Sequence, residues 1–151
     1  MAPERAGYSH RSLIEKLGIK AGHRIALVDA PSGFDATLGP LPPGVRRARA
    51  LRGAIDVIVF FASDAAELRR RISSVKRAIA PAGMLWLCWP KKTSGVVRDI
   101  DESIVRDVGL AAGLVDVKVC AVDATWSGLK FVYRLRDRPK TATPRRARRT
   151  N

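Results

Sequence analysis

The chain of 151 residues is long enough for one domain with a core that is stable unaided, and 46% of its residues are hydrophobic, which excludes a largely disordered protein. Its apolar runs are far shorter than the about 20 residues that span a bilayer, and the first residues, MAPERAGYSHRS, contain no apolar segment typical of a secretory signal. We therefore expect a cytoplasmic protein that does not bind membranes. The formal net charge is +14, and its distribution along the chain is uneven.

Residues 1–8 are expected to be a flexible N-terminus. Ser12 and Glu15 have the spacing of a capping box, in which each side chain bonds an amide that the first helical turn leaves unpaired. Gly18 is suited to the left-handed position that ends a helix. The sequence therefore predicts a short first helix from about residue 12 to residue 18.

The segment RIALVDA, residues 24–30, is nearly continuous in apolar residues, as expected of a strand that is covered on both faces. It ends at Pro31–Gly33, and residues 34–38 have room for one or two helical turns before GPLPPG. Residues 45–51 are predicted to form a short edge strand.

Residues 55–62 form the clearest buried strand, because β-branched and aromatic side chains dominate it. Ser63 or Asp64 is suited to cap the helix that follows. The apolar residues of that helix recur at helical spacing: Leu68, Ile72, Val75 and Ile79. The segment Pro81–Gly83 is predicted to end the helix and lead into the strand MLWLCW, residues 84–89.

A further helix is predicted over residues 101–112, followed by strands at 115–122 and 129–135. The six residues between these strands favour an antiparallel hairpin. Alternating strands and helices predict one α/β domain over residues 9–135. We expect a small Rossmann-like, mostly parallel sheet with helices on both faces and a C-terminal antiparallel hairpin.

Neither the cysteines nor the histidines indicate a metal or catalytic centre. Cys88 and Cys120 lie in apolar, strand-like segments and are expected to be buried, with a reactive thiol as the less favoured alternative. His10 and His23 have no partner at the spacing of metal ligands, and no serine–histidine–acid set is present. We therefore predict no catalytic residue, no metal and no cofactor.

The loop WPKKTSG, residues 89–95, is the main candidate site, because ligands of open α/β sheets bind beyond the carboxyl ends of the strands. Lys91, Lys92, Ser94 and Gly95 supply ammonium groups, a hydroxyl and a flexible backbone amide that suit a phosphate or carboxylate. The loop lacks the spacing of a P-loop. The alternative is an exposed loop whose lysines are solvated.

Three more residues complete the candidate ligand site. Asp29 ends the first strand, where it either orients a ligand, pairs with Lys91 or caps the turn through Ser32; pairing or capping is favoured. Gly33 is the single glycine of that turn. Trp126, in the loop of the hairpin, is either a lid on the core or a flat surface for a partner.

The blocks LVDAPSGF, WPKKTSG and VDATWSGLKFV resemble an uncharacterised bacterial family of domains of unknown function, over roughly residues 8–135. The order of elements resembles a class I methyltransferase-type Rossmann fold, in which the sheet closes with an antiparallel strand. The resemblance implies that fold and brings no established activity with it.

The chain departs from the methyltransferase pattern where such enzymes hold their nucleoside cofactor. The family pattern has a glycine-rich turn after the first strand and an acid after the second strand. Here the turn reads DAPSGF, and VRRARALRG contains no acid. We therefore favour a non-catalytic binding or accessory domain for an anionic small molecule or a protein partner. A divergent S-adenosylmethionine-dependent methyltransferase is the alternative.

Residues 134–151 carry eight basic residues and one acid, so half of the net charge lies there. Residues 136–151 are predicted to be a disordered basic tail. Its arginines are weak candidates for nonspecific contact with nucleic acid: Arg145, Arg146, Arg148 and Arg149. The alternative is a solubilising extension without a dedicated partner.

Overall fold

The computed structural model of the chain describes residues 11–95 and 99–139. Its helices are α1 (Leu13–Leu17), α2 (Phe34–Leu38), α3 (Ala65–Ala78) and α4 (Glu102–Ala111). Its strands are β1 (Arg24–Val28), β2 (Arg46–Arg47), β3 (Ile55–Phe61), β4 (Ile79–Pro90), β5 (Leu114–Ala121) and β6 (Trp126–Tyr133). Two short 3-10 turns, η2 (Lys92–Ser94) and η3 (Leu135–Asp137), follow β4 and β6.

The strands form one six-stranded sheet in the order β2-β1-β3-β4-β6-β5. β2, β1, β3 and β4 are parallel, whereas β6 is antiparallel to both β4 and β5. The predicted α/β class, with a mostly parallel sheet and a C-terminal antiparallel hairpin, is confirmed.

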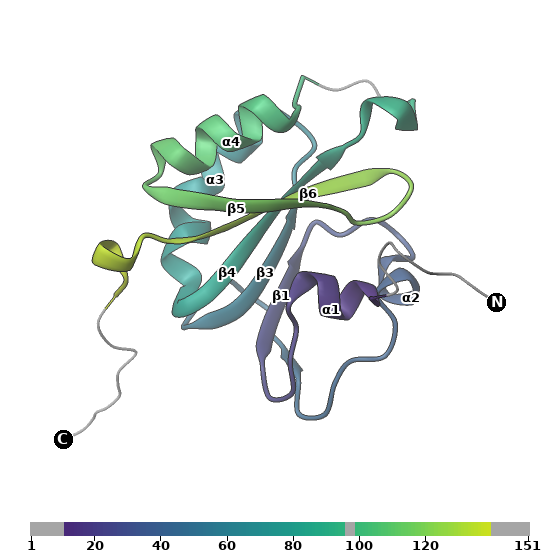
Figure 1. Ribbon diagram of the computed structural model, residues 1–151, viewed down its shortest axis with the longest axis vertical. Coiled ribbons are helices and arrows are strands. Elements are labelled where there is room, and N and C mark those ends of the chain that lie inside the picture. The colour runs from purple at the N-terminus through teal and green to yellow at the C-terminus, as the bar shows by residue number, and fades with distance from the viewer. Residues whose placement is uncertain (1–10, 96–98, 140–151) are drawn as a thin grey trace.

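Helices cover both faces of the sheet, as Figure 1 shows, with α3 and α4 grouped on one face and α1 and α2 on the other. Trp86 and Trp89, three residues apart on β4, therefore belong to different cores. The fully buried Trp86 donates its Nε1–H to the carbonyl oxygen of Leu17 at 2.9 Å, which ties α1 to the sheet.

The predicted caps of α1 and the predicted start of α3 are confirmed. Ser12 and Glu15 form the capping box, and Gly18 ends α1 with a φ of 80°. Asp64 caps α3 by accepting a hydrogen bond from the backbone N–H of Glu67.

β4 begins earlier than predicted, because α3 ends at Ala78 and the chain becomes extended at Ile79. The segment Pro81–Gly83, which was expected to separate helix from strand, thus lies inside β4. A Cβ on Gly83 would lie 2.9 Å or less from the carbonyl oxygens of Ile55 and Asp56, so this strand pair is close only because the residue is glycine. The edge strand predicted at 45–51 is reduced to β2.

The hairpin contains an irregularity on β5. Asp116 lies opposite Phe131 and Lys118 lies opposite Lys130, so Val117 is an extra residue between two consecutive pairs. Asp116 therefore faces α4, whereas Lys118 faces the side of the sheet that carries α1.

In the described part of the chain, no helix combines the length and apolar composition needed to cross a bilayer.

Candidate functional site

The strand order reverses at β1: the chain adds β2 on one side of β1 and then β3 and β4 on the other side. Ligands of open α/β sheets bind at such a switch point, outside the carboxyl ends of the strands. Asp29 follows β1 there. Its φ of 57° is the single positive value at a non-glycine residue among residues 11–95 and 99–139. The backbone is therefore held in an unfavourable conformation at this edge.

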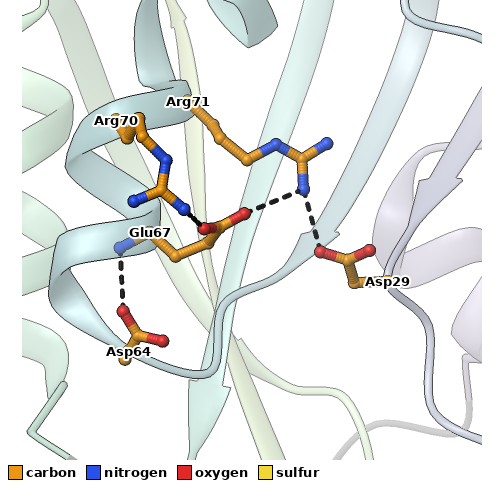
Figure 2. Close-up of polar contacts among 5 residues, drawn as sticks. All are labelled: Asp29, Asp64, Glu67, Arg70 and Arg71. Atoms are coloured by element: carbon orange, nitrogen blue, oxygen red, sulfur yellow. Dashed lines mark hydrogen bonds and ion pairs between the residues drawn. The ribbon is translucent and has the colours of Figure 1, made fainter.

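Asp29 forms an ion pair with Arg71 of α3, with 2.9 Å between Oδ2 and the guanidinium (Figure 2). Arg71 also lies 3.6 Å from the carboxylate of Glu67, and its guanidinium carbon is 5.0 Å from the centre of the Phe60 ring. The sequence favoured an Asp29 that pairs with Lys91 or caps the turn through Ser32. The structure shows Asp29 paired, but with Arg71. Arg71 thus links α3 to the carboxyl end of β1.

A pocket of about 240 Å³ lies beside this ion pair. It is lined by the end of β1, by residues 48–51 after β2, and by Arg71. Asp29 is its one carboxylate, and Arg49 and Arg71 are its cations. The pocket is smaller than the about 300 Å³ at which small-molecule sites begin.

A larger pocket, of about 530 Å³, lies beyond the carboxyl end of β4, and we call it the Lys91 pocket. The end of β4 and η2 contribute Trp89 and Lys91 to Thr93, β6 contributes Ser127, and the start of α4 contributes residues 101–103 and Arg106. Its volume is in the range of small-molecule sites. The sheet edge predicted as the ligand side thus carries a pocket of sufficient size.

The loop after β4 is fixed through its backbone. The N–H of Lys91 donates to the carbonyl oxygen of Thr125 at 2.7 Å, and the hydroxyl of Ser94 donates to the carbonyl oxygen of Lys91 at 2.6 Å. Gly95 ends η2 with a φ of 81°. Ser94 and Gly95 therefore shape the loop, while Lys92 and Thr93 are exposed at the pocket.

The acidic side chains that line the Lys91 pocket, Asp101 and Glu102, are already bonded. Glu102 and Asp116 each contact Arg106 at 2.9 Å, and Asp101 caps α4 by accepting from the N–H of Ile104. The hydrogen bond that Asp116 accepts from Arg106 lowers the pKa of Asp116, and the hydrogen bonds that Arg106 donates to Asp116 and Glu102 raise the pKa of Arg106.

Lys91 and Lys92 differ from Arg106 in this respect. Within residues 11–95 and 99–139, no carboxylate forms an ion pair with either lysine. Their charges therefore remain available to a ligand.

Trp126 lies on the other face of the sheet. Its ring meets Phe61 edge-on at 5.1 Å, and Phe61 meets Phe34 in the same way at 4.8 Å. Gly33 is the residue before α2, with a φ of 83°. The structure therefore separates Trp126 and Gly33 from the Lys91 pocket, and the contacts of Trp126 favour a lid on the core.

The arginines proposed for nucleic-acid contact, Arg145, Arg146, Arg148 and Arg149, lie outside the described residues. The sequence did not predict how Arg71 and Arg106 are paired. Their spacing from Glu67 and Glu102, four residues earlier on a helix, is a signal for local ion pairs. No sequence signal points to their distant partners.

No family model matches this chain, and no curated protein matches its sequence. Solved structures do match its fold. An S-adenosylmethionine-dependent methyltransferase from Aquifex aeolicus has a TM-score of 0.57 at 14% identity, covering 79% of this chain and 86% of its own. A precorrin-6y C5,15-methyltransferase from Geobacter metallireducens has a TM-score of 0.54 at 12% identity, with 81% and 86% covered.

Fibrillarin from Aeropyrum pernix, solved with natively bound S-adenosyl-L-methionine, has a TM-score of 0.53 at 13% identity, covering 80% of this chain and 72% of its own. At these identities the likeness concerns the fold. The chain has a methyltransferase-like Rossmann fold, as the order of elements in the sequence implied.

Proposed function

We propose that this protein binds a small anionic molecule in the Lys91 pocket, as a methyltransferase-fold domain without a catalytic role of its own. The observation that carries the proposal is the pair Lys91 and Lys92, which have no ion-pair partner among the described residues and line a pocket at the carboxyl edge of the sheet. The acids of the same pocket are held by Arg106 and by the start of α4.

The other groups around the pocket suit the same ligand class. Ser103 and Ser127 add hydroxyls that can donate to a phosphate or carboxylate oxygen. Trp89 adds apolar surface at the base, and is itself buried. A phosphorylated or carboxylated metabolite with an apolar portion matches this combination.

Methyl transfer with S-adenosylmethionine is the second candidate, and the solved structures favour it over a non-catalytic role. The side chains at the switch point do not fit that cofactor. The pocket there is about 240 Å³, Pro31 has no N–H to donate, and Asp29 is engaged by Arg71. The residues at the switch point therefore argue against S-adenosylmethionine there.

Membership of the bacterial family of unknown function remains a prediction, as do the single domain over residues 9–135 and the cytoplasmic location. None of these predictions assigns a reaction. The choice between the two candidates depends on ligand binding.

Isothermal titration with adenosine 5′-monophosphate, citrate and S-adenosylmethionine separates the candidates. We expect an anion to bind, and Lys91→Ala with Lys92→Ala to weaken that binding about tenfold or more. Arg134→Ala with Arg136→Ala removes two exposed cations far from the pocket and serves as the matched control. S-adenosylmethionine binding that survives the lysine substitutions but is lost in Asp29→Ala would establish the second candidate.

A further inference from the structure

A second basic pocket, of about 330 Å³, lies between α1 and the β5–β6 hairpin, on the face of the sheet opposite the Lys91 pocket. We call it the Lys130 pocket. Lys16 and Lys20 line it from α1 and the turn after α1, and Lys118 and Lys130 line it from the hairpin. Lys130 lies beside Trp86, four residues before the end of β4, so the two pockets are separate.

The two hairpin lysines face each other directly. Lys118 is the cross-strand partner of Lys130, and both side chains lie on the side of the sheet that carries α1. Like charges directly opposite each other across a strand pair are destabilising. Burial, and then the charges of Lys118 and Lys20, lower the pKa of Lys130.

The Lys130 pocket has an excess of positive charge, because four lysines and Arg11 line it together with only two carboxylates, Glu15 and Asp56. Its two carboxylates accept hydrogen bonds from the backbone, Glu15 from the N–H of Ser12 and Asp56 from the N–H of Arg24. No carboxylate in the described part of the chain forms an ion pair with the lysines of the pocket: Lys16, Lys20, Lys118 and Lys130.

The walls of the pocket are fixed. The bond from Trp86 to Leu17 holds the end of α1 against the sheet. His23 accepts the N–H of Lys20 through Nδ1 at 3.1 Å, which orders the turn that carries Lys20. Lys16, Lys20, Lys118 and Lys130 thus line one pocket together with Arg11, from elements whose packing does not depend on a ligand.

We propose that the Lys130 pocket is a binding site for a compact di- or triphosphate group, with Lys118 and Lys130 on one side of it and Lys16 and Lys20 on the other. Ammonium groups are point charges that suit phosphate oxygens, and several of them match a multiply charged chain better than a single carboxylate. The volume of about 330 Å³ suits a small phosphorylated molecule.

The first test is isothermal titration of the full chain with inorganic tripolyphosphate. Lys118→Ala with Lys130→Ala is expected to weaken binding about tenfold or more, and Lys118→Arg with Lys130→Arg to retain most of it. Lys91→Ala with Lys92→Ala is the matched control, expected to change the affinity less than about twofold. Equal binding by the wild type and the Lys118, Lys130 double alanine variant would overturn the site.

The control also keeps this proposal distinct from the proposed function. Loss of tripolyphosphate binding in the Lys91, Lys92 variant alone would refute the Lys130 pocket and favour the Lys91 pocket. Far-UV circular dichroism and thermal unfolding of every variant establish that each one is folded. A folded double alanine variant with weakened binding supports the site.

The source of the phosphate is settled by two further titrations. Adenosine 5′-triphosphate should bind and should lose affinity in the same variant, as a small molecule that enters the pocket would. Tighter binding of duplex DNA than of tripolyphosphate, with the same sensitivity to Lys118 and Lys130, would replace the proposal with a surface for nucleic-acid backbone.

Proton linkage supplies a readout that a merely structural role would not give. An anion beside Lys130 stabilises its charged form, so binding at alkaline pH should take up protons. Titrations in two buffers of different ionisation enthalpy should show this uptake in the wild type and less of it in Lys130→Met. Equal uptake in both proteins would count against Lys130 as a contact.

Discussion

The carboxyl edge of the sheet and the Lys130 pocket are both rich in cations, but they differ in how those charges are balanced. At the edge, Arg71 binds Asp29 and Glu67, and Arg106 binds Glu102 and Asp116. In the Lys130 pocket, the lysines have no ion-pair partner among the described residues.

The difference shows that the net charge of a chain says little about where charge is available for binding. A paired arginine contributes mainly to local geometry, because its carboxylate partner cancels most of its field at a distance. An unpaired lysine keeps its full charge for a ligand. Lys91 and Lys92 resemble the Lys130 pocket in this respect, although they lie at the edge.

Removing the bond that holds α1 should have the largest effect. Trp86→Phe leaves the carbonyl oxygen of Leu17 without its buried donor and reduces packing around a fully buried ring. We expect a loss of about 2–3 kcal/mol in the free energy of unfolding, measured by urea titration. A loss below about 0.5 kcal/mol would mean that α1, and with it the Lys130 pocket, is not fixed by this bond.

Removing the paired arginine at the edge should have a smaller effect. Arg71→Met keeps an apolar stem but loses the ion pairs to Asp29 and Glu67 and the contact with Phe60. We expect a destabilisation of about 1 kcal/mol in urea unfolding.

The neighbouring arginine provides the control for that substitution. Arg70 contacts the same Glu67 but is 68% exposed, so Arg70→Met should cost about 0.3 kcal/mol. Equal losses of unfolding free energy in the two variants would show that the ion pair between Arg71 and Asp29 adds no stability.

Removing an unpaired lysine should have the smallest effect, and of opposite sign. Burial and the charges of Lys118 and Lys20 lower the pKa of Lys130 in the folded protein. Between this lowered pKa and the ordinary lysine value of about 10.4, the unfolded chain therefore carries more bound protons than the folded one. Wild-type stability should therefore rise with pH between the lowered pKa and that value. Lys130→Met should stabilise the protein at neutral pH by about 0.5 kcal/mol, and the gain should vanish above about pH 10.4.

Urea unfolding over a range of pH measures this effect, with Lys92→Met as the control. Lys92 is an exposed lysine of the Lys91 pocket with no facing lysine in the sheet. Its substitution should change stability at neutral pH by no more than about 0.5 kcal/mol. A destabilised Lys130→Met at neutral pH would mean that the apolar stem of Lys130 matters more than the repulsion.

Local signals in the sequence were sufficient for most of the fold. The capping residues Ser12, Glu15 and Asp64, and the apolar runs of β1 and β3, depend on neighbours in the chain. The same applies to the position of Lys91 and Lys92 beyond the carboxyl end of β4, because they directly follow a buried strand.

Contacts between distant segments could not be predicted in the same way. Asp29 and Arg71 are 42 residues apart, and nothing near either residue shows that they meet. The start of β4 was misplaced because Pro81 and Gly83 usually interrupt a strand, whereas here Gly83 permits a close approach to β3.

The extra residue at Val117 has a consequence for how β5 should be compared with other chains. Side chains of a regular strand alternate, so residues two apart share a face. Asp116 and Lys118 are two residues apart but lie on opposite faces of the sheet. The extra residue Val117 shifts the alternation of inward and outward side chains for the residues of β5 that follow it. A relative that is one residue shorter at this point would keep both the acid facing α4 and the lysine facing Lys130. A sequence alignment that avoids this one-residue gap would therefore match the wrong residues of the two β5 strands, although their side chains occupy equivalent positions.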